Sequence, residues 1–330
     1  MNDRFFLSSL TSHAVHLLSL LLILLLLVSC SKESPTEEVG VSTTSFPLPQ
    51  ITTGNYPAMD GSTSTSPVGA MLACKIMGVP CIWMETMDGS RSILPNLTNF
   101  QGEFPAIGHH GTHNAYLNLI NKEADLILVA RLPSLDELNL ANSLGVRLAP
   151  EPVALDAFVF IVNEVNPVEQ LTKSEIQRIY TGEITNWDQV AGRDEEIHPY
   201  QRNENSGSQE LMRALVMGDL PMIDVPEMVL PKMIAPFYAV SEETAGIGYS
   251  VYYYEQNMAP EEHVKLVGID GIKPNSKSIQ SKEYPLTTEV YAVIRGDLSA
   301  GNIAFQLRDW MLTPEGQELI EESGYVPLSN

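Results

Sequence analysis

Apolar and polar positions along the chain predict strands that alternate with helices from about residue 106 onward. Residues 124–131 and 153–162 form apolar, β-prone runs of strand length. Residues 303–312 and 314–320 instead repeat their apolar positions with the period of an α-helix. This alternation predicts an α/β fold with helices layered against a sheet, rather than an all-α or all-β fold.

A hydroxyl-rich loop comes just before one of the clearest helix starts. Ser66 suits the N-cap of that helix, Pro67 suits its first position, and Gly78 suits the stop after its last turn. Loops of this composition are also common as linkers that bind nothing. At a helix start, however, they add hydroxyl donors to the unpaired amides of the first turn. The hydroxyl residues of this loop are Ser62, Thr63, Ser64 and Thr65.

A second helix start follows a glycine-rich turn with three histidines. Thr112 stands in this turn, and the predicted helix includes residues 116–120. His110 and His113 have a spacing that zinc ligands can have, but no further ligand with a recognisable spacing accompanies them. Together with His109, they are therefore expected to line the mouth of a cleft or to cap the helix. The sequence predicts no metal site.

A third helix start follows an arginine. Ser206 suits the N-cap, and Gln209 stands at the spacing of a capping box. Gly207 would let the backbone approach a ligand closely, and the hydroxyls of Ser206 and Ser208 flank it. Arg202 adds a planar guanidinium that can hold two oxygens of a tetrahedral anion. Taken alone, the stretch fits either an ordinary capped surface helix or a cradle for an oxyanion.

Length and charge limit what such a cradle can bind. The chain has 330 residues, more than one domain usually contains, and its 44% hydrophobic content suffices for packed cores, so two lobes are expected. The formal net charge of −22 argues against nucleic acids and anionic membrane surfaces as partners. It also repels small anions at long range. An anion site must therefore be local, built from dipoles, hydroxyls and one or two arginines.

The N-terminal residues predict the compartment. Arg4 precedes an apolar run over residues 17–28, which ends just before Cys30. This pattern resembles a bacterial lipoprotein signal, with residues 1–30 as the signal region and Cys30 as the lipidated residue. A transmembrane anchor is the alternative, but the uninterrupted apolar run is short for a span. Residues 31–53 are rich in Ser, Thr, Pro and Glu and read as a flexible tether.

Two further cysteines are present in the rest of the chain. Cys74 and Cys81 could form a disulfide across a helix end, because the predicted compartment permits one. A pair of buried free thiols fits the sequence nearly as well, since spacing alone does not fix the geometry.

Several short blocks of sequence, in order and at matching spacing, resemble one known family. The chain is similar to the substrate-binding lipoproteins of the phosphate ABC-transporter family, which are periplasmic phosphate-binding proteins. The resemblance covers nearly everything from residue 56 to the end of the chain. The blocks are residues 60–67, 179–187, 202–208, 247–249, 284–286, 313–317 and 324–328.

This resemblance implies a two-lobed α/β fold, the type II periplasmic-binding-protein fold, with the ligand in a cleft and a hinge between the lobes. The first lobe would consist of residues 54–150 and 260–330. The second lobe would consist of residues 151–259. Both lobes together would make one ligand-binding domain.

The resemblance also implies a set of phosphate ligands shared between the lobes. Family members that select phosphate over sulfate place a carboxylate after the strand that here ends at Ala130, whereas this chain carries Arg131 there. Such a carboxylate rejects sulfate because sulfate has no proton to donate to it. Arg131 is therefore a possible ligand, and Asp60 or Glu204 could stand in for the carboxylate. The matching ligand positions are Ser62, Thr63, Ser64, Thr112, Arg202, Ser206, Gly207 and Ser208.

The implied function is capture of inorganic phosphate, or a similar tetrahedral oxyanion, for an ABC importer. The expected partners are the permease and ATPase subunits and a membrane reached through the lipid on Cys30, at the bacterial cell envelope and facing the periplasm or the exterior. The protein is expected to be a monomer without cofactor, metal or nucleic acid. A sensing or scaffolding lipoprotein is the alternative. A phosphoester hydrolase is disfavoured because no nucleophile elbow, P-loop or dense cluster of acidic metal ligands is found.

Overall fold

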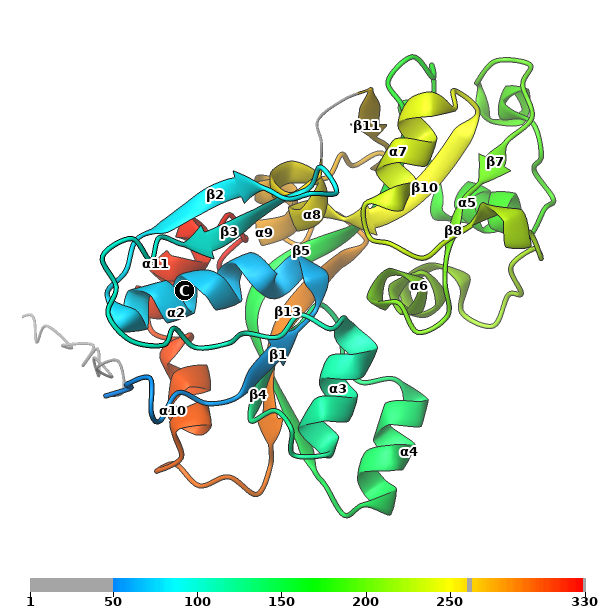
Figure 1. The fold of residues 1–330 in the computed structure, drawn as a ribbon. Helices are drawn as coiled ribbons and strands as arrows, with labels where there is room; N and C mark the ends of the chain where they lie inside the picture. Colours follow the sequence, from blue (N-terminus) through cyan, green and yellow to red (C-terminus); the bar gives the residue numbers. More distant parts are fainter. Residues whose placement is uncertain (1–49, 260–262, 329–330) are drawn as a thin grey trace, which may run out of the picture. The chain divides into compact units, whose positions relative to one another are not determined.

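One long strand, β5 (Leu148–Asn163), connects two groups of strands in the computed structural model, which describes residues 50–259 and 263–328 (Figure 1). Residues 148–157 pair antiparallel with β13 (Thr287–Arg295), and residues 158–162 pair antiparallel with β10 (Gly246–Val251). From Val153 to its end, every residue of β5 is buried. This burial explains the unbroken apolar run in the sequence, since a strand covered on both faces needs no polar alternation.

The sheet has seven strands in the order β1-β4-β13-β5-β10-β7, with β11 also paired to β5. We call β1, β4, β13 and residues 148–157 the first half, and residues 158–163, β10, β7 and β11 the second half. The strands not yet placed are β1 (Met59–Gly61), β4 (Leu126–Val129), β7 (His198–Pro199) and β11 (Val264–Leu266).

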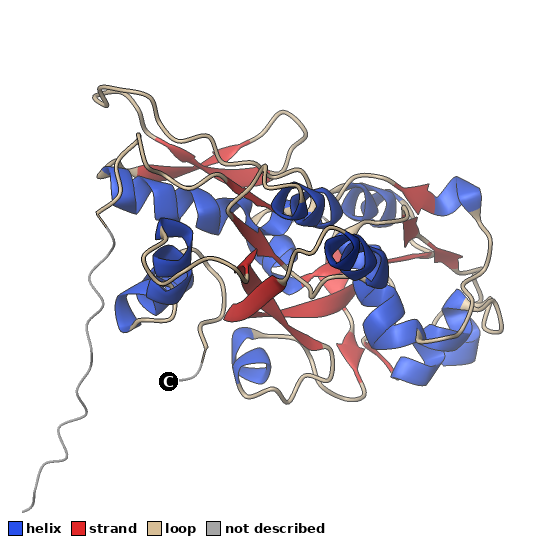
Figure 2. Ribbon diagram, turned by 90° about the horizontal axis from the view of Figure 1, so that it is seen from below, coloured by secondary structure: helices blue, strands red, loops and turns tan. Residues whose placement is uncertain are grey.

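Helices pack against both halves of the sheet and lie on both sides of the strands (Figure 2). Those against the first half are α2 (Ser66–Met77), α3 (Thr112–Ile120), α10 (Ile303–Trp310) and α11 (Pro314–Glu322), with α4 (Leu135–Ser143) on α3. Those against the second half of the sheet or along β5 are α7 (Ala235–Glu242), α8 (Tyr252–Asn257) and α9 (Ser276–Gln280). The remaining helical segments are η1 (Thr63–Thr65), α5 (Lys173–Tyr180), η2 (Trp187–Val190), α6 (Gly207–Leu211), η3 (Met212–Met217) and η4 (Pro226–Met228).

Three small two-stranded sheets complete the fold. The antiparallel hairpin of β2 (Cys81–Glu85) and β3 (Arg91–Pro95) packs on α2, and a disulfide between Cys74 and Cys81 joins its base to that helix. The sequence left open whether these cysteines form a disulfide or stay as free thiols, and the structure shows the disulfide. The other pairs are β6 (Gln170–Leu171) with β12 (Gly268–Ile269), and β8 (Gln201–Arg202) with β9 (Val229–Leu230).

Asp156 stands within the apolar run of β5, next to the point where the strand changes partners. Its Oδ1 accepts hydrogen bonds from the amides of Ala157 at 2.8 Å and Tyr253 at 3.0 Å, and the second of these caps the first turn of α8. Burial raises the pKa of Asp156 to about 7, although both amides act against the shift. A short carboxyl side chain inside the strand thus fastens α8 to β5.

The predicted N-terminal signal and Cys30 lie outside the described residues. All the elements above belong to one compact unit, Ser45–Asn330. Of the predicted tether only residues 50–53 are described, and Ile51 among them is buried. No helix in the described part of the chain is long and apolar enough to cross a membrane.

The predicted lobe boundaries stay predictions. The one near residue 150 falls inside β5, whose partner changes between Ala157 and Phe158. The one near residue 260 falls on residues 260–262, which the structure does not describe.

Candidate functional site

A cavity of about 540 Å³ is walled by segments from both halves of the fold. All the ligand positions that the family resemblance implies lie in the wall of this cavity, except for Arg131, which was only a possible ligand. These are Ser62, Thr63, Ser64, Thr112, Arg202, Ser206, Gly207 and Ser208. Three helix starts far apart in the sequence thus meet around one space.

The first wall is the hydroxyl-rich loop between β1 and α2. The amide of Ser62 and the hydroxyl of Thr65 both donate to the carbonyl of Leu128, at 2.9 and 2.6 Å, which fixes the loop to the end of β4. The Ser62 and Ser64 hydroxyls lie 3.2 Å apart, and both residues are buried. The helix itself begins at Ser66, one position before the prediction, because residues 63–65 form a 3₁₀ turn. The wall therefore offers hydroxyls and first-turn amides to a ligand.

Thr112 forms a second wall as the first residue of α3. The preceding residue, Gly111, has a φ of +89° that favours glycine, and its amide donates to Gly61 across the loop. Thr112 is buried, and its Oγ1 would lie 2.6 Å from a Cβ atom placed on Gly207. A side chain at position 207 would therefore clash with Thr112, so glycine lets these two helix starts lie close together in the cavity wall.

Arg202 supplies the positive charge of the third wall. Only 6% of its surface is exposed, and its guanidinium donates to neutral atoms: Nε to the Leu230 carbonyl at 2.8 Å and Nη2 to the Pro231 carbonyl at 3.2 Å. Nη1 lies 3.4 Å from the sulfur of Met233. No described carboxylate forms an ion pair with Arg202, and burial lowers the pKa of its guanidinium. A buried cation without a counter-ion favours the binding of an anion.

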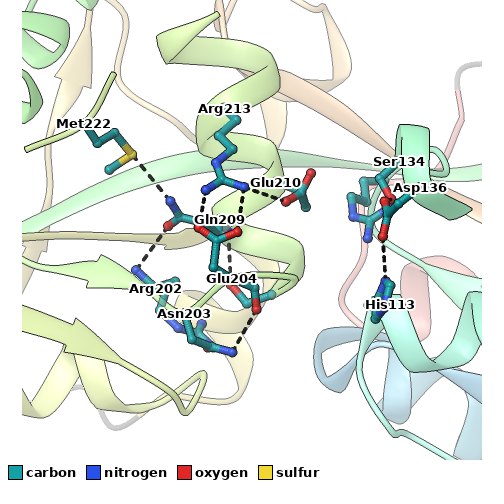
Figure 3. Close-up of polar contacts among 12 residues, drawn as sticks. His113, Ser134, Asp136, Arg202, Asn203, Glu204, Gln209, Glu210, Arg213 and Met222 are labelled. Carbon is teal, nitrogen blue, oxygen red and sulfur yellow. Dashed lines mark hydrogen bonds and ion pairs between the residues drawn. The ribbon is translucent and has the colours of Figure 1, made fainter. Parts of the chain in front are cut away.

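Two side chains fix the main chain at Arg202. Its amide donates to the hydroxyl of Tyr249 at 2.8 Å and to Oε1 of Gln209 at 3.2 Å, and Tyr249 in turn donates to Gln209. Ser206 caps α6 by accepting from the Gln209 amide at 3.1 Å, so half of the expected capping box forms. The Gln209 side chain turns instead to Arg202 and Met222 (Figure 3). The sequence does not predict these roles, because Tyr249 approaches Arg202 from β10, which is distant along the chain.

Arg131 is not brought to the cavity wall. Its Nη1 and Nη2 donate to the two carboxylate oxygens of Glu137 at 2.8 and 2.7 Å. Glu137 is fully buried and is also 2.9 Å from Nδ1 of His113. Burial opposes ionisation of Arg131, but the hydrogen bonds and charge of Glu137 raise its pKa. The possible ligand role for Arg131 is therefore not supported, because a nearby acid already engages its guanidinium.

The two carboxylates named as stand-ins are engaged as well. Asp60 does not line the cavity, and it accepts from the amides of Gly61 and His110 and from the side chains of His110 and Asn118. Despite its burial, these bonds lower the pKa of Asp60. Glu204 does line the cavity, but both of its oxygens bond Arg213 (Figure 3).

The three histidines of the glycine-rich turn line the cavity, as one of their two expected roles required. His110 faces Asp60 and His113 faces Glu137, each through Nδ1 at 2.9 Å. Within the described ranges, no group of three His, Cys, Asp or Glu residues is arranged to hold a metal ion. The geometry therefore gives no support to the zinc alternative.

Comparison with known proteins identifies the family. The sequence profile of the PBP superfamily domain matches residues 97–315. The chain belongs to the PBP superfamily. The resemblance drawn from the sequence blocks is thereby confirmed.

Several bacterial proteins are similar in sequence to this chain, although the identity is low. The phosphate-binding protein PstS of Bacillus subtilis is 26% identical over 184 residues, a match that covers 56% of this chain and 59% of that protein. Protein SphX of Synechococcus elongatus is 24% identical over 269 residues, which cover 74% of this chain and 77% of that protein. The chain thus spans less than two thirds of the first of these relatives and about three quarters of the second.

Solved structures share the PBP fold over most of the chain. A substrate-binding protein from Clostridium perfringens, assigned to a phosphate ABC transporter and solved with bound phosphate, has a TM-score of 0.64 and 21% identity, and the match covers 83% of this chain and 99% of that one. An ABC-type phosphate transport receptor from Vibrio cholerae has a TM-score of 0.59, 21% identity and coverage of 82% and 99%. At this identity the likeness establishes the fold, and it confirms the predicted fold class.

Proposed function

We propose that this chain is an extracytoplasmic solute-binding protein that captures inorganic phosphate, or a similar tetrahedral oxyanion, for an ABC importer. The observation that carries the proposal is Arg202, a buried cation without a described counter-ion on the wall of a cavity rich in hydroxyls. The relatives and the solved structures support phosphate as the ligand. PstS is named as a phosphate-binding protein, and the C. perfringens structure holds phosphate.

In the proposed site the anion bridges the two halves of the fold. Arg202 would hold two of its oxygens through the terminal nitrogens of the guanidinium, exchanging weak neutral acceptors for a charged one. From the same side, the residues 206–208 would supply two hydroxyls and backbone amides. Residues 62–64 and Thr112 would supply hydroxyls and first-turn amides from the other side.

A local site of this kind also explains how a chain with a large negative net charge can bind an anion. The chain carries −22 overall, so an approaching anion meets repulsion outside the cavity. Inside, water is displaced and the effective dielectric constant falls, so that one buried guanidinium and several fixed dipoles act at short range. The proposed role is binding and delivery to permease and ATPase subunits rather than catalysis, in line with the names of the relatives.

Calorimetry of the purified chain tests this function. We expect saturable one-site binding of phosphate, and much weaker binding of sulfate under the same buffer and salt. Molybdate and a phosphonate serve as further tetrahedral anions that differ in size and in protonation. Absence of heat for every one of these anions would contradict the proposed function.

We also propose that the mature protein is tethered to the membrane by a lipid on Cys30, which lies in the part of the sequence that resembles a lipoprotein signal. Replacing Cys30 with serine removes the acylated thiol, so most of the protein is expected to move from the membrane to the soluble fraction of the cell envelope. Immunoblots of both fractions measure this shift, and Ser34→Ala in the predicted tether is the control. A Cys30→Ser protein of mature length that stays with the membrane fraction would refute the anchor.

A further inference from the structure

The tip of the β2–β3 hairpin reaches the cavity, although no part of the sequence pointed to it. Asp88 and Ser90 both belong to the cavity wall. The base of the hairpin is bound to α2 by the Cys74–Cys81 disulfide. Two contacts hold the other end: the hydroxyl of Tyr238 donates to the Asp88 carbonyl at 2.7 Å, and the Arg91 amide donates to the Met258 carbonyl at 2.7 Å. The tip is thus held in place by elements far from it in the sequence.

The turn at the tip leaves one carboxylate oxygen of Asp88 without a hydrogen bond to any described residue. Its Oδ1 accepts from the hydroxyls of Thr86 and Ser90, at 2.6 and 2.7 Å, and from the Ser90 amide at 3.2 Å. Its Oδ2 makes no hydrogen bond to any described residue. Gly89 follows with a φ of +81°, and a Cβ there would lie 2.2 Å from the Tyr238 hydroxyl, so the turn has this form only with glycine.

Asp88 stays ionised on the cavity wall that also includes Arg202. The hydrogen bonds from Thr86 and Ser90 lower its pKa, and the charge of Lys232, another residue of the cavity wall, adds to this. Burial raises the pKa of Tyr254 on the same wall, and the charges of Asp88 and Arg202 act on that ring in opposite directions. Asp88, Arg202 and Tyr254 are thus residues of the same cavity wall.

The other nearby carboxylates are already engaged. Glu204 is the other acid among the described residues of the cavity wall, and both of its oxygens bond Arg213. Glu137 is fully buried against Arg131 and His113, and Asp60 accepts four hydrogen bonds away from the wall. This leaves Asp88, an exposed residue, as the acid of the described cavity wall that still has a carboxylate oxygen without a hydrogen bond.

We propose that Asp88 is a specificity-determining residue of the anion site, whose Oδ2 accepts a hydrogen bond from a protonated oxygen of the ligand. The proposal rests on the proposed function and narrows it to oxyanions that carry a proton at neutral pH. Hydrogen phosphate can donate to Asp88, whereas sulfate places an unprotonated oxygen against a carboxylate and is repelled. The acceptor thus comes from a hairpin rather than from the end of β4, where Arg131 is paired with Glu137.

Replacing Asp88 with asparagine tests this role. Asparagine keeps an oxygen for Thr86 and Ser90, and it puts an N–H donor where the free carboxylate oxygen was. We expect the ratio of sulfate to phosphate dissociation constants to fall at least tenfold, chiefly because sulfate binds more tightly. Glu85→Gln removes a charge from an exposed position of the same hairpin and should leave the ratio unchanged. Glu204→Gln removes the charge of the other acid in the cavity wall and shows whether that acid sets the ratio instead.

The outcomes separate this inference from the function on which it rests. If the wild-type chain binds no phosphate, the proposed function fails, and the role of Asp88 fails with it. If phosphate binds but Asp88→Asn changes both affinities by the same factor, in either direction, Asp88 acts only through hairpin structure or general repulsion. An unchanged ratio overturns the inference as well, as does a fall in the ratio caused by Glu204→Gln alone. Thermal unfolding of each variant confirms that the fold is kept.

Discussion

Phosphate binding is expected to weaken by about 2–5 kcal/mol when Arg202 is replaced by alanine. The guanidinium is buried and has neutral acceptors in the described structure, so an anion bound beside it supplies its charged partner. Without Arg202 the anion would face hydroxyls and amides alone, inside a cavity that excludes water. The loss should therefore exceed that of any single hydroxyl, for which about 1–3 kcal/mol is expected.

Calorimetric titration of the Arg202→Ala chain with phosphate measures this loss. Arg178→Ala is the matched control, because Arg178 is half-exposed on α5, pairs with Glu183 and does not line the cavity. Unfolding curves show whether the freed carbonyls of Leu230 and Pro231 disturb the fold. Phosphate affinity equal to that of the wild type would remove Arg202 from the site.

Replacing Arg131 with methionine is expected to destabilise the fold by about 3–5 kcal/mol, with little effect on phosphate affinity. Glu137 is fully buried, and both of its oxygens bond the Arg131 guanidinium. The single replacement therefore leaves a buried carboxylate with only the amide of Ser134 and the ring of His113 as its described partners. The apolar part of the arginine is kept by methionine, which separates loss of charge from loss of packing. Urea unfolding at neutral pH measures the change in free energy.

The double variant Arg131→Met, Glu137→Gln is the control for this second prediction. Removing both charges should recover much of the lost stability, because no unpaired charge remains buried. If the double variant is as unstable as the single one, the ion pair is not the cause. A large loss of phosphate affinity in a folded Arg131→Met chain would instead return Arg131 to the binding site.

The parts of the site that the sequence predicts are those with local signals. Ser206 is recognisable as a cap from its immediate neighbours, and it accepts the expected bond from the Gln209 amide. The long apolar run of residues 153–162 is recognisable as a buried strand for the same reason, and it lies within β5. The family resemblance then groups the three helix starts, which no local pattern could bring together.

The parts that the sequence does not predict depend on contacts between distant segments. The partner of Arg131 is Glu137, and nothing in the spacing distinguishes that acid from the many others of an acidic chain. Tyr249 reaches Arg202 from β10, and Asp88 belongs to the cavity wall because the tip of the hairpin is held there by Tyr238. Likewise, the disulfide of Cys74 depends on where β2 places Cys81.

A tetrahedral oxyanion is expected to bind between Arg202 and the loop of residues 62–64. An anomalous difference map from crystals of the chain grown with arsenate tests it most directly, because arsenate has the shape and protonation of phosphate and its arsenic atom is located independently of the protein. We predict one strong arsenic peak in the cavity, in contact with Arg202, residues 206–208 and Thr112. A saturating concentration of arsenate that leaves this cavity without a peak, or that places the peak elsewhere on the molecule, would contradict the account.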